Sequence, residues 1–127
     1  MLQLSRRERS LLSFLFAAGV VAVIIGSLLP DSSPVMTAVG KLPVTDKALH
    51  FTAYLALATL ATLARPGLRT AMAFVIGLAL LGALLELAPG LVPGRTPELA
   101  DEGANALGCL CGVLVGRLAA ARPVPVS

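Results

Sequence analysis

The sequence predicts an all-α membrane protein in which four transmembrane helices form a bundle and both termini lie in the cytoplasm. Hydrophobic residues make up 57% of the 127 residues and charged residues only 13%, whereas soluble domains carry roughly 25% charged residues. The few charges and the Pro/Gly clusters separate four apolar stretches, and basic residues gather at one end of these stretches. A chain of this length predicts one transmembrane domain, residues 1–127, and excludes catalysis by a separate soluble domain.

The first two predicted helices are bounded by charges and by a cap. Residues 11–29 form an uncharged stretch close to the ~20 residues that a hydrocarbon core of about 30 Å requires. This stretch is longer than the apolar part of a signal peptide, about 7–15 residues, and no A-x-A site follows it, so we expect a retained anchor. The second helix, residues 46–64, follows the capping residue Thr45 and contains the only histidine, His50.

The last two predicted helices carry charged residues near the outer membrane surface. The third, residues 70–88, follows a Pro-Gly turn and should therefore run antiparallel to the second, with Glu86 near its end. The fourth, residues 101–121, spans the membrane only if Asp101 lies at the outer interface and Arg117 snorkels to the inner one.

The basic residues set the expected topology, because short cytoplasmic loops are enriched in Lys and Arg. With four helices, one side of the membrane, which we expect to be the cytoplasmic side, carries Arg6, Arg7, Arg9, Arg65, Arg69, Arg117 and Arg122. The opposite side carries a net negative charge. The pI of about 9.4 therefore reflects topology, and because no basic patch is interleaved with aromatic residues, we expect no nucleic-acid partner.

Polar side chains on three of the predicted helices lie at a similar depth. With a rise of ~1.5 Å per residue, His50 lies roughly 22 Å from the inner end of its helix, Glu86 about 24 Å and Asn105 about 18 Å. Ionisable groups in the outer third of a bilayer are costly and usually face a bundle interior or a water-filled cavity. We therefore expect these residues to share one outward-facing site.

Helical spacing adds further candidates to this site. Asp46, His50 and Tyr54 form one stripe at i, i+4 and i+8, and Asp101 lies one turn before Asn105. An aspartate one turn from a histidine can orient the imidazole and raise its basicity. The candidate ligand-binding residues are Lys47, His50, Tyr54, Glu86, Arg95, Asp101 and Asn105, and the candidate catalytic residues are His50, Asp46, Glu86 and Asp101. The sequence assigns no metal ligand and no cofactor.

A structural interpretation stands beside the functional one for each of these residues. Polar side chains on facing transmembrane helices often serve only as interhelical hydrogen bonds, typically worth about 0.6–2 kcal/mol each. Asp46 and Lys47 fit ordinary interfacial positions, and Asp101 fits the N-terminus of a helix, where the helix dipole favours an acidic residue. Function is favoured for His50 and Glu86 because they lie deeper.

Small residues on the fourth helix predict close packing. Gly108, Gly112 and Gly116 recur at i, i+4 and i+8 and form a ridge that lets another helix approach closely, from this chain or from a partner. Cys109 and Cys111 are two residues apart on the same helix and point in different directions. We interpret both cysteines as small buried side chains rather than as a disulfide or a metal site.

The polar residues of the last three predicted helices combine into one pattern. It reads Asp46-Lys47-x-x-His50-Phe51-x-x-Tyr54, then Glu86 with Arg95 nine residues later, then Asp101-x-x-x-Asn105-x-x-Gly108. Over about residues 46–116 this pattern resembles the VanZ-like family of small bacterial integral membrane proteins. The family commonly has a Gln three residues after the Glu, where this chain has Pro89. The resemblance implies a multi-pass protein of the bacterial cytoplasmic (inner) membrane with a cell-envelope role, such as low-level resistance to the glycopeptide teicoplanin.

Three classes of function follow from these expectations. The first is the binding or handling of an anionic cell-envelope lipid or its precursor, with membrane lipids as the partners. The second is an accessory subunit that docks on a larger membrane complex, or on a second copy, through its glycine ridge. The third is a membrane-embedded hydrolase or transferase with His50 as general base, which a metal bound by His50 with Glu86 or Asp101 would favour.

Overall fold

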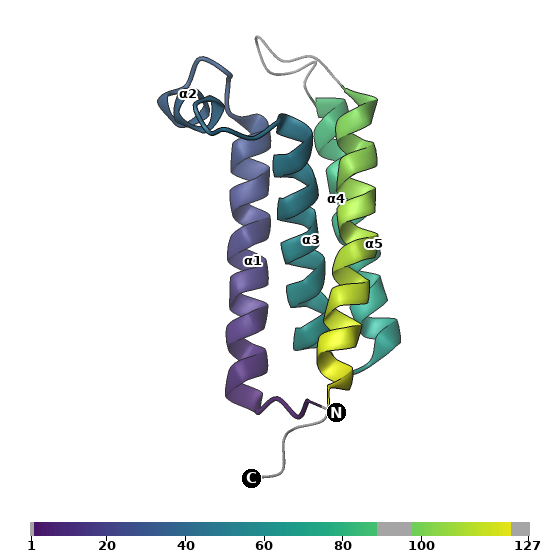
Figure 1. The fold of residues 1–127 in the computed structure, drawn as a ribbon. Coiled ribbons are helices and arrows are strands. Elements are labelled where there is room, and N and C mark those ends of the chain that lie inside the picture. Colours follow the sequence, from purple (N-terminus) through teal and green to yellow (C-terminus); the bar gives the residue numbers. More distant parts are fainter. Residues whose placement is uncertain (1, 89–97, 123–127) are drawn as a thin grey trace.

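The computed structural model describes residues 2–88 and 98–122, and in these residues the chain is all-helical. Of the five helices described, four are long and apolar enough to cross a membrane: α1 (Arg6–Leu28), α3 (Asp46–Ala64), α4 (Leu68–Leu87) and α5 (Leu99–Ala121). These helices run side by side, and the short helix α2 (Pro34–Gly40) lies beyond the end of α1 (Figure 1). Helix length and composition thus agree with the predicted membrane protein.

The first helix begins at Arg6, earlier than the apolar stretch that starts at residue 11. Ser5 explains this early start, because its Oγ accepts a hydrogen bond from the backbone N of Glu8 at 3.2 Å. The Glu8 Oε2 in turn accepts from the backbone N of Ser5 at 2.7 Å, which completes a capping box. The arginines of this first turn therefore belong to α1 rather than to a preceding tail.

The connection between α1 and α3 contains a helix that the sequence prediction treated as loop. Ser33 caps α2 by accepting a hydrogen bond from the backbone N of Met36 at 3.2 Å, and Pro34 occupies its first turn, where proline is tolerated. Thr45 caps α3 through a hydrogen bond from the backbone N of Ala48 at 3.1 Å, which confirms the predicted cap.

α3 lies at the centre of the arrangement, since it contacts α1, α4 and α5, and most extensively α5. The glycines of the ridge explain this extensive contact. A Cβ added at Gly108 would lie 2.5 Å from the backbone oxygen of Phe51, and one added at Gly112 would lie 2.5 Å from that of Leu55. Gly116 likewise lies against Thr62. The ridge therefore packs against a helix of the same chain.

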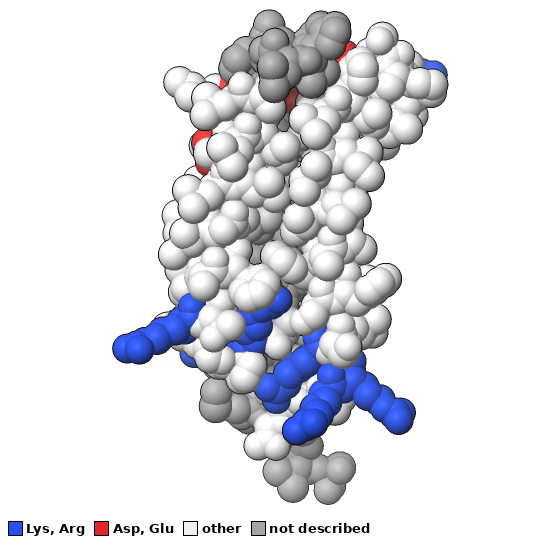
Figure 2. Space-filling view, turned by 180° about the vertical axis from the view of Figure 1, so that it is seen from behind, with Lys and Arg blue, Asp and Glu red and all other residues white. Residues whose placement is uncertain are grey.

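The core is small, and most of the large apolar side chains lie outside it. Buried residues such as Ala58, Ala61 and Cys109 pack between the helices. Both cysteines are free thiols, but Cys111 is only partly buried, in contrast to the expectation that both are buried. Large side chains such as Phe14 and Leu110 are each 68% exposed on the long helices. An uncharged band separates an end rich in Arg from an end where Asp and Glu are seen (Figure 2). This surface suits a lipid environment.

An arginine between two aromatic rings joins α1 to the turn between α3 and α4. The guanidinium carbon of Arg65 lies 3.3 Å from the ring centroid of Phe74 and 5.3 Å from that of Phe16. The two rings meet edge to face, with centroids 5.9 Å apart. Burial lowers the pKa of Arg65 from its usual value. Cation–π attraction therefore holds α1, α4 and the turn between α3 and α4 together near the end that carries the arginines.

We expect Gly112→Ala to destabilise the protein, because its new methyl group would press on the Leu55 carbonyl, which belongs to the backbone and cannot rotate away. Overpacking of this kind lowers the free energy of unfolding by about 1–3 kcal/mol. The matched control is Gly103→Ala on the same helix, where an added Cβ meets nothing within 4 Å. Both variants are compared by thermal unfolding in detergent, which is monitored through the reaction of the buried Cys109 thiol with a thiol-reactive dye. Equal melting temperatures of the two variants would contradict the expectation.

Candidate functional site

Five polar side chains from three helices meet at one end of the molecule and are called the polar cluster here. They are His50 on α3, Glu86 on α4, and Asp101, Glu102 and Asn105 on α5. The residues come together because α3 and α5 begin at this end while α4 finishes there. Antiparallel packing of α4 against its neighbours therefore places the end of one helix beside the starts of two others.

Asn105 is the buried centre of the polar cluster, with only 1% of its surface exposed. Its Nδ2 lies 3.3 Å from Glu102 Oε2, and its Oδ1 lies 2.8 Å from His50 Nδ1. An amide nitrogen donates hydrogen bonds and an amide oxygen accepts them, so Asn105 donates to Glu102 and accepts from the imidazole. His50 Nδ1 is therefore protonated and donates a hydrogen bond to Asn105 Oδ1. In a neutral ring with this tautomer, the lone pair lies on Nε2.

Two carboxylates lie close to the His50 ring, each near a different ring nitrogen. Glu86 Oε1 lies 3.7 Å from Nδ1, and Asp101 Oδ2 lies 3.8 Å from Nε2. Both distances exceed those of hydrogen bonds, although all three side chains are mostly buried, with exposures of 28% for His50, 16% for Glu86 and 14% for Asp101. Asp101 Oδ1 is buried and has no hydrogen-bond partner among the described residues.

Lys47 lies at the rim of the polar cluster and is already paired with carboxylates. Its Nζ donates a hydrogen bond to Glu98 Oε1 at 3.2 Å and lies 3.8 Å from Asp101 Oδ1. The Lys47 side chain remains 49% exposed and that of Glu98 56%, so solvent screens this pair. The positive charge of Lys47, a candidate for binding an anion, is therefore largely neutralised by Glu98 and Asp101.

Tyr54 lies beneath the polar cluster with 2% of its surface exposed. Gly82 on α4 makes room for it, because an added Cβ there would lie 3.0 Å from the tyrosine hydroxyl and 3.2 Å from Asn105 Nδ2. The phenol and the amide thus fill the space that a larger residue on α4 would need. This packing fixes the floor of the site.

The structure brings together most of the residues predicted for the site, but with different neighbours. Asp46 is exposed on the first turn of α3, and the described side chain that orients His50 is Asn105 rather than Asp46. Glu102 was missed, although its position three residues before Asn105 is a spacing at which helical side chains interact. Arg95 and Pro89 lie outside the described residues.

We expect the single histidine to carry its proton on Nδ1 in the neutral state. Selective ¹⁵N labelling of histidine, measured at pH 8 and so above the ordinary imidazole pKa of about 6.5, reports the protonated nitrogen directly. Asn105→Leu removes the acceptor and should shift the proton toward Nε2. Thr59→Val, which removes a different α3–α5 hydrogen bond, should leave the tautomer unchanged. A ring protonated on Nε2 in the unaltered protein would contradict this assignment.

The site's geometry is the basis for its interpretation, since comparison with family models, curated proteins and solved structures finds no match to this chain. The VanZ-like pattern remains a resemblance carried by residues of α3, α4 and α5. Four apolar helices and a polar cluster at one of their ends are what the described residues establish.

Proposed function

We propose that the chain is a four-helix bundle of the bacterial inner membrane that holds the headgroup of an anionic cell-envelope lipid, or of its precursor, at its outer face. The observation that carries this proposal is the convergence of the polar cluster at the helix ends opposite the arginines. Ionisable side chains at such a depth mark functional sites by default, because burying them in lipid is costly. A role of this kind also fits the resemblance to the VanZ-like family.

The charge distribution supports a topology with both termini in the cytoplasm. Figure 2 shows blue basic side chains, which at this end are all arginines, gathered where α1 begins. The N-terminal segment and the end of α5 meet there, since the backbone N of Leu2 donates to the Ala120 oxygen at 2.8 Å. By the positive-inside rule this end faces the cytoplasm and the polar cluster faces outward.

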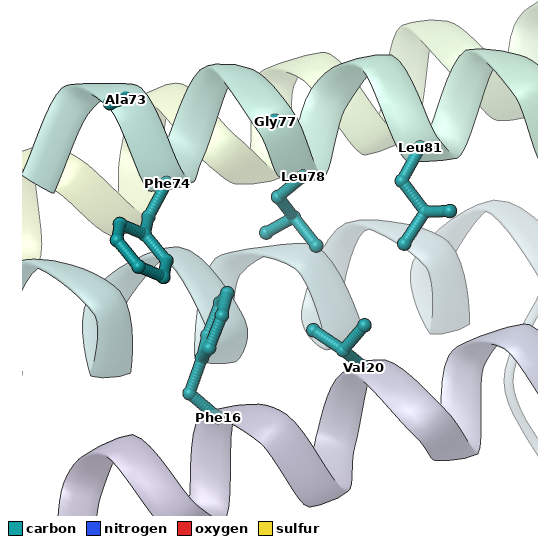
Figure 3. A pocket seen from close by; sticks show the side chains of 7 residues that line it. All are labelled: Phe16, Val20, Ala73, Phe74, Gly77, Leu78 and Leu81. Atoms are coloured by element: carbon teal, nitrogen blue, oxygen red, sulfur yellow. The ribbon is translucent and has the colours of Figure 1, made fainter.

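An apolar groove between α1 and α4 supports a lipid ligand. Its volume is about 360 Å³, and its lining residues are Phe16, Val20, Ala73, Phe74, Gly77, Leu78 and Leu81. In Figure 3 the side chains of Phe16 and Val20 point from α1 toward those of α4. A groove with this lining suits an alkyl chain that lies along the helices.

The charge balance of the polar cluster constrains how an anionic headgroup can bind. Glu86, Asp101 and Glu102 outnumber the one lysine at the rim, and that lysine is shared between Glu98 and Asp101. A phosphate or carboxylate headgroup therefore needs positive charge beyond Lys47. Arg95, in the connection between α4 and α5, is the predicted source on this chain.

A membrane-embedded hydrolase or transferase is the second candidate function. The specific observation in its favour is the position of His50 Nε2, which makes no hydrogen bond among the described residues and lies 3.8 Å from the Asp101 carboxylate, as suits a general base. Docking on a larger complex through the glycine ridge is less favoured, because α3 of the same chain occupies the ridge at Gly108 and Gly112.

A reporter fused to the C-terminus tests the topology. We expect a C-terminal green fluorescent protein to fluoresce and a C-terminal alkaline phosphatase to be inactive, because that end should remain in the cytoplasm. The same phosphatase inserted after Gly40, between α2 and α3, should be active. The opposite pattern of activities would show that the polar cluster faces the cytoplasm.

Lipid binding by purified protein tests the function. Native mass spectrometry should show tighter binding of phosphatidylglycerol than of phosphatidylcholine with the same acyl chains. We expect Arg95→Gln to weaken phosphatidylglycerol binding about tenfold or more, because a hydrogen bond to a charged group contributes about 1.5–3 kcal/mol. Lys41→Gln, the same change of charge at the C-cap of α2, is the matched control. Equal binding of the two lipids, or an equal loss in the control, would refute the proposed headgroup site.

A further inference from the structure

Three potential metal ligands converge in the polar cluster from three different helices. One atom each of His50, Glu86 and Asp101 lies within 4.8 Å of the others. Asp101 Oδ2 lies 3.8 Å from His50 Nε2, which is too long for a hydrogen bond. This separation is close to the roughly 3.4 Å between two ligands bound at about 2.0–2.1 Å to a tetrahedral ion. Because a ligand atom of Glu86 also lies within 4.8 Å of the other two residues, an inward movement of the three side chains would enclose a cation.

The orientation of His50 is a second and independent observation. Glu102 fixes the Asn105 amide, Asn105 accepts the Nδ1 proton, and Nε2 keeps its lone pair toward Asp101. Histidines that bind metals almost always donate their other ring N–H to a fixed acceptor in this way. The site thus holds its imidazole in the orientation that a metal requires.

The electrostatics of the polar cluster also call for a cation. Glu86 and Asp101 are mostly buried beside the His50 ring, and Asp101 Oδ1 has no hydrogen-bond partner among the described residues. Lys47 approaches only Asp101, at 3.8 Å, and is held at the rim by Glu98. Partly buried carboxylates are stabilised when they are paired or when they coordinate a metal.

We propose that His50 Nε2, Glu86 and Asp101 bind one divalent transition-metal cation of the Zn²⁺ class. One imidazole nitrogen and two carboxylate oxygens suit Zn²⁺ better than Ca²⁺ or Mg²⁺, which prefer oxygen ligands alone. Three protein ligands leave a fourth position of a tetrahedral ion open. An anionic headgroup can occupy that position, although metal binding itself does not depend on the identity of the lipid.

The test uses Co²⁺ as a spectroscopic substitute for Zn²⁺, added to the full-length protein in lipid-free detergent. Visible absorption should titrate to one ion per chain, and Zn²⁺ should displace the Co²⁺. His50→Gln, Glu86→Gln and Asp101→Asn should each raise the dissociation constant by at least about tenfold, the lower bound for residues that support a metal. Asp31→Asn, a carboxylate lost from the connection before α2, is the matched control and should bind as the unaltered protein does.

Labelled histidine gives a readout that does not depend on any variant folding correctly. Zn²⁺ should shift the Nε2 resonance of His50 while Nδ1 keeps its proton. No Co²⁺ binding at millimolar concentration, coordination through Nδ1, or equal losses in Asp31→Asn and Glu86→Gln would overturn the proposal. Because no lipid is present, a negative result would leave the headgroup proposal standing on its own test.

Discussion

The close approach of α3 and α5 is the constraint on which the rest of the structure depends. Glycines at positions 108 and 112 let α5 pack directly on the backbone of α3, where any side chain would collide with carbonyl oxygens. Asn105 lies one turn before Gly108, on the same contact between α3 and α5, and reaches His50 at 2.8 Å. The separation of the two helices, set by residues without side chains, therefore fixes the distance between the groups of the polar cluster.

α4 contributes to the polar cluster by a similar combination of one small residue and one charged residue. Gly82 leaves space for Tyr54 and Asn105, and Glu86 lies one turn further along, at the level of His50. Without a small residue at position 82, α4 would stand away from the other two helices and its carboxylate would lie farther from the imidazole. The face of α4 that packs closely on its neighbours is thus the same face that carries Glu86.

The sequence allows the long apolar helices and the shared level of the polar residues along them to be predicted, because helix rise is constant and the loop between α3 and α4 is short. Hydrogen-bond partners could not be predicted, since they depend on the rotation of each helix about its axis and on side-chain rotamers. Spacing along one helix suggested Asp46 as the partner of His50, whereas the partner that the structure shows, Asn105, comes from another helix. The helix α2 was missed because Ser33 and Pro34 were read as loop residues rather than as a cap and a first turn.

The order of the helices in the chain has a consequence for how the protein is made. The largest partner of α3 is α5, which leaves the ribosome only after α4 has been synthesised between them. Until α5 enters the membrane, the face of α3 that carries Leu55 and Ala58 has only lipid to pack against, and His50 lacks its acceptor. The polar cluster therefore cannot assemble before α5 is synthesised, so a chain that stops after α4 has no site.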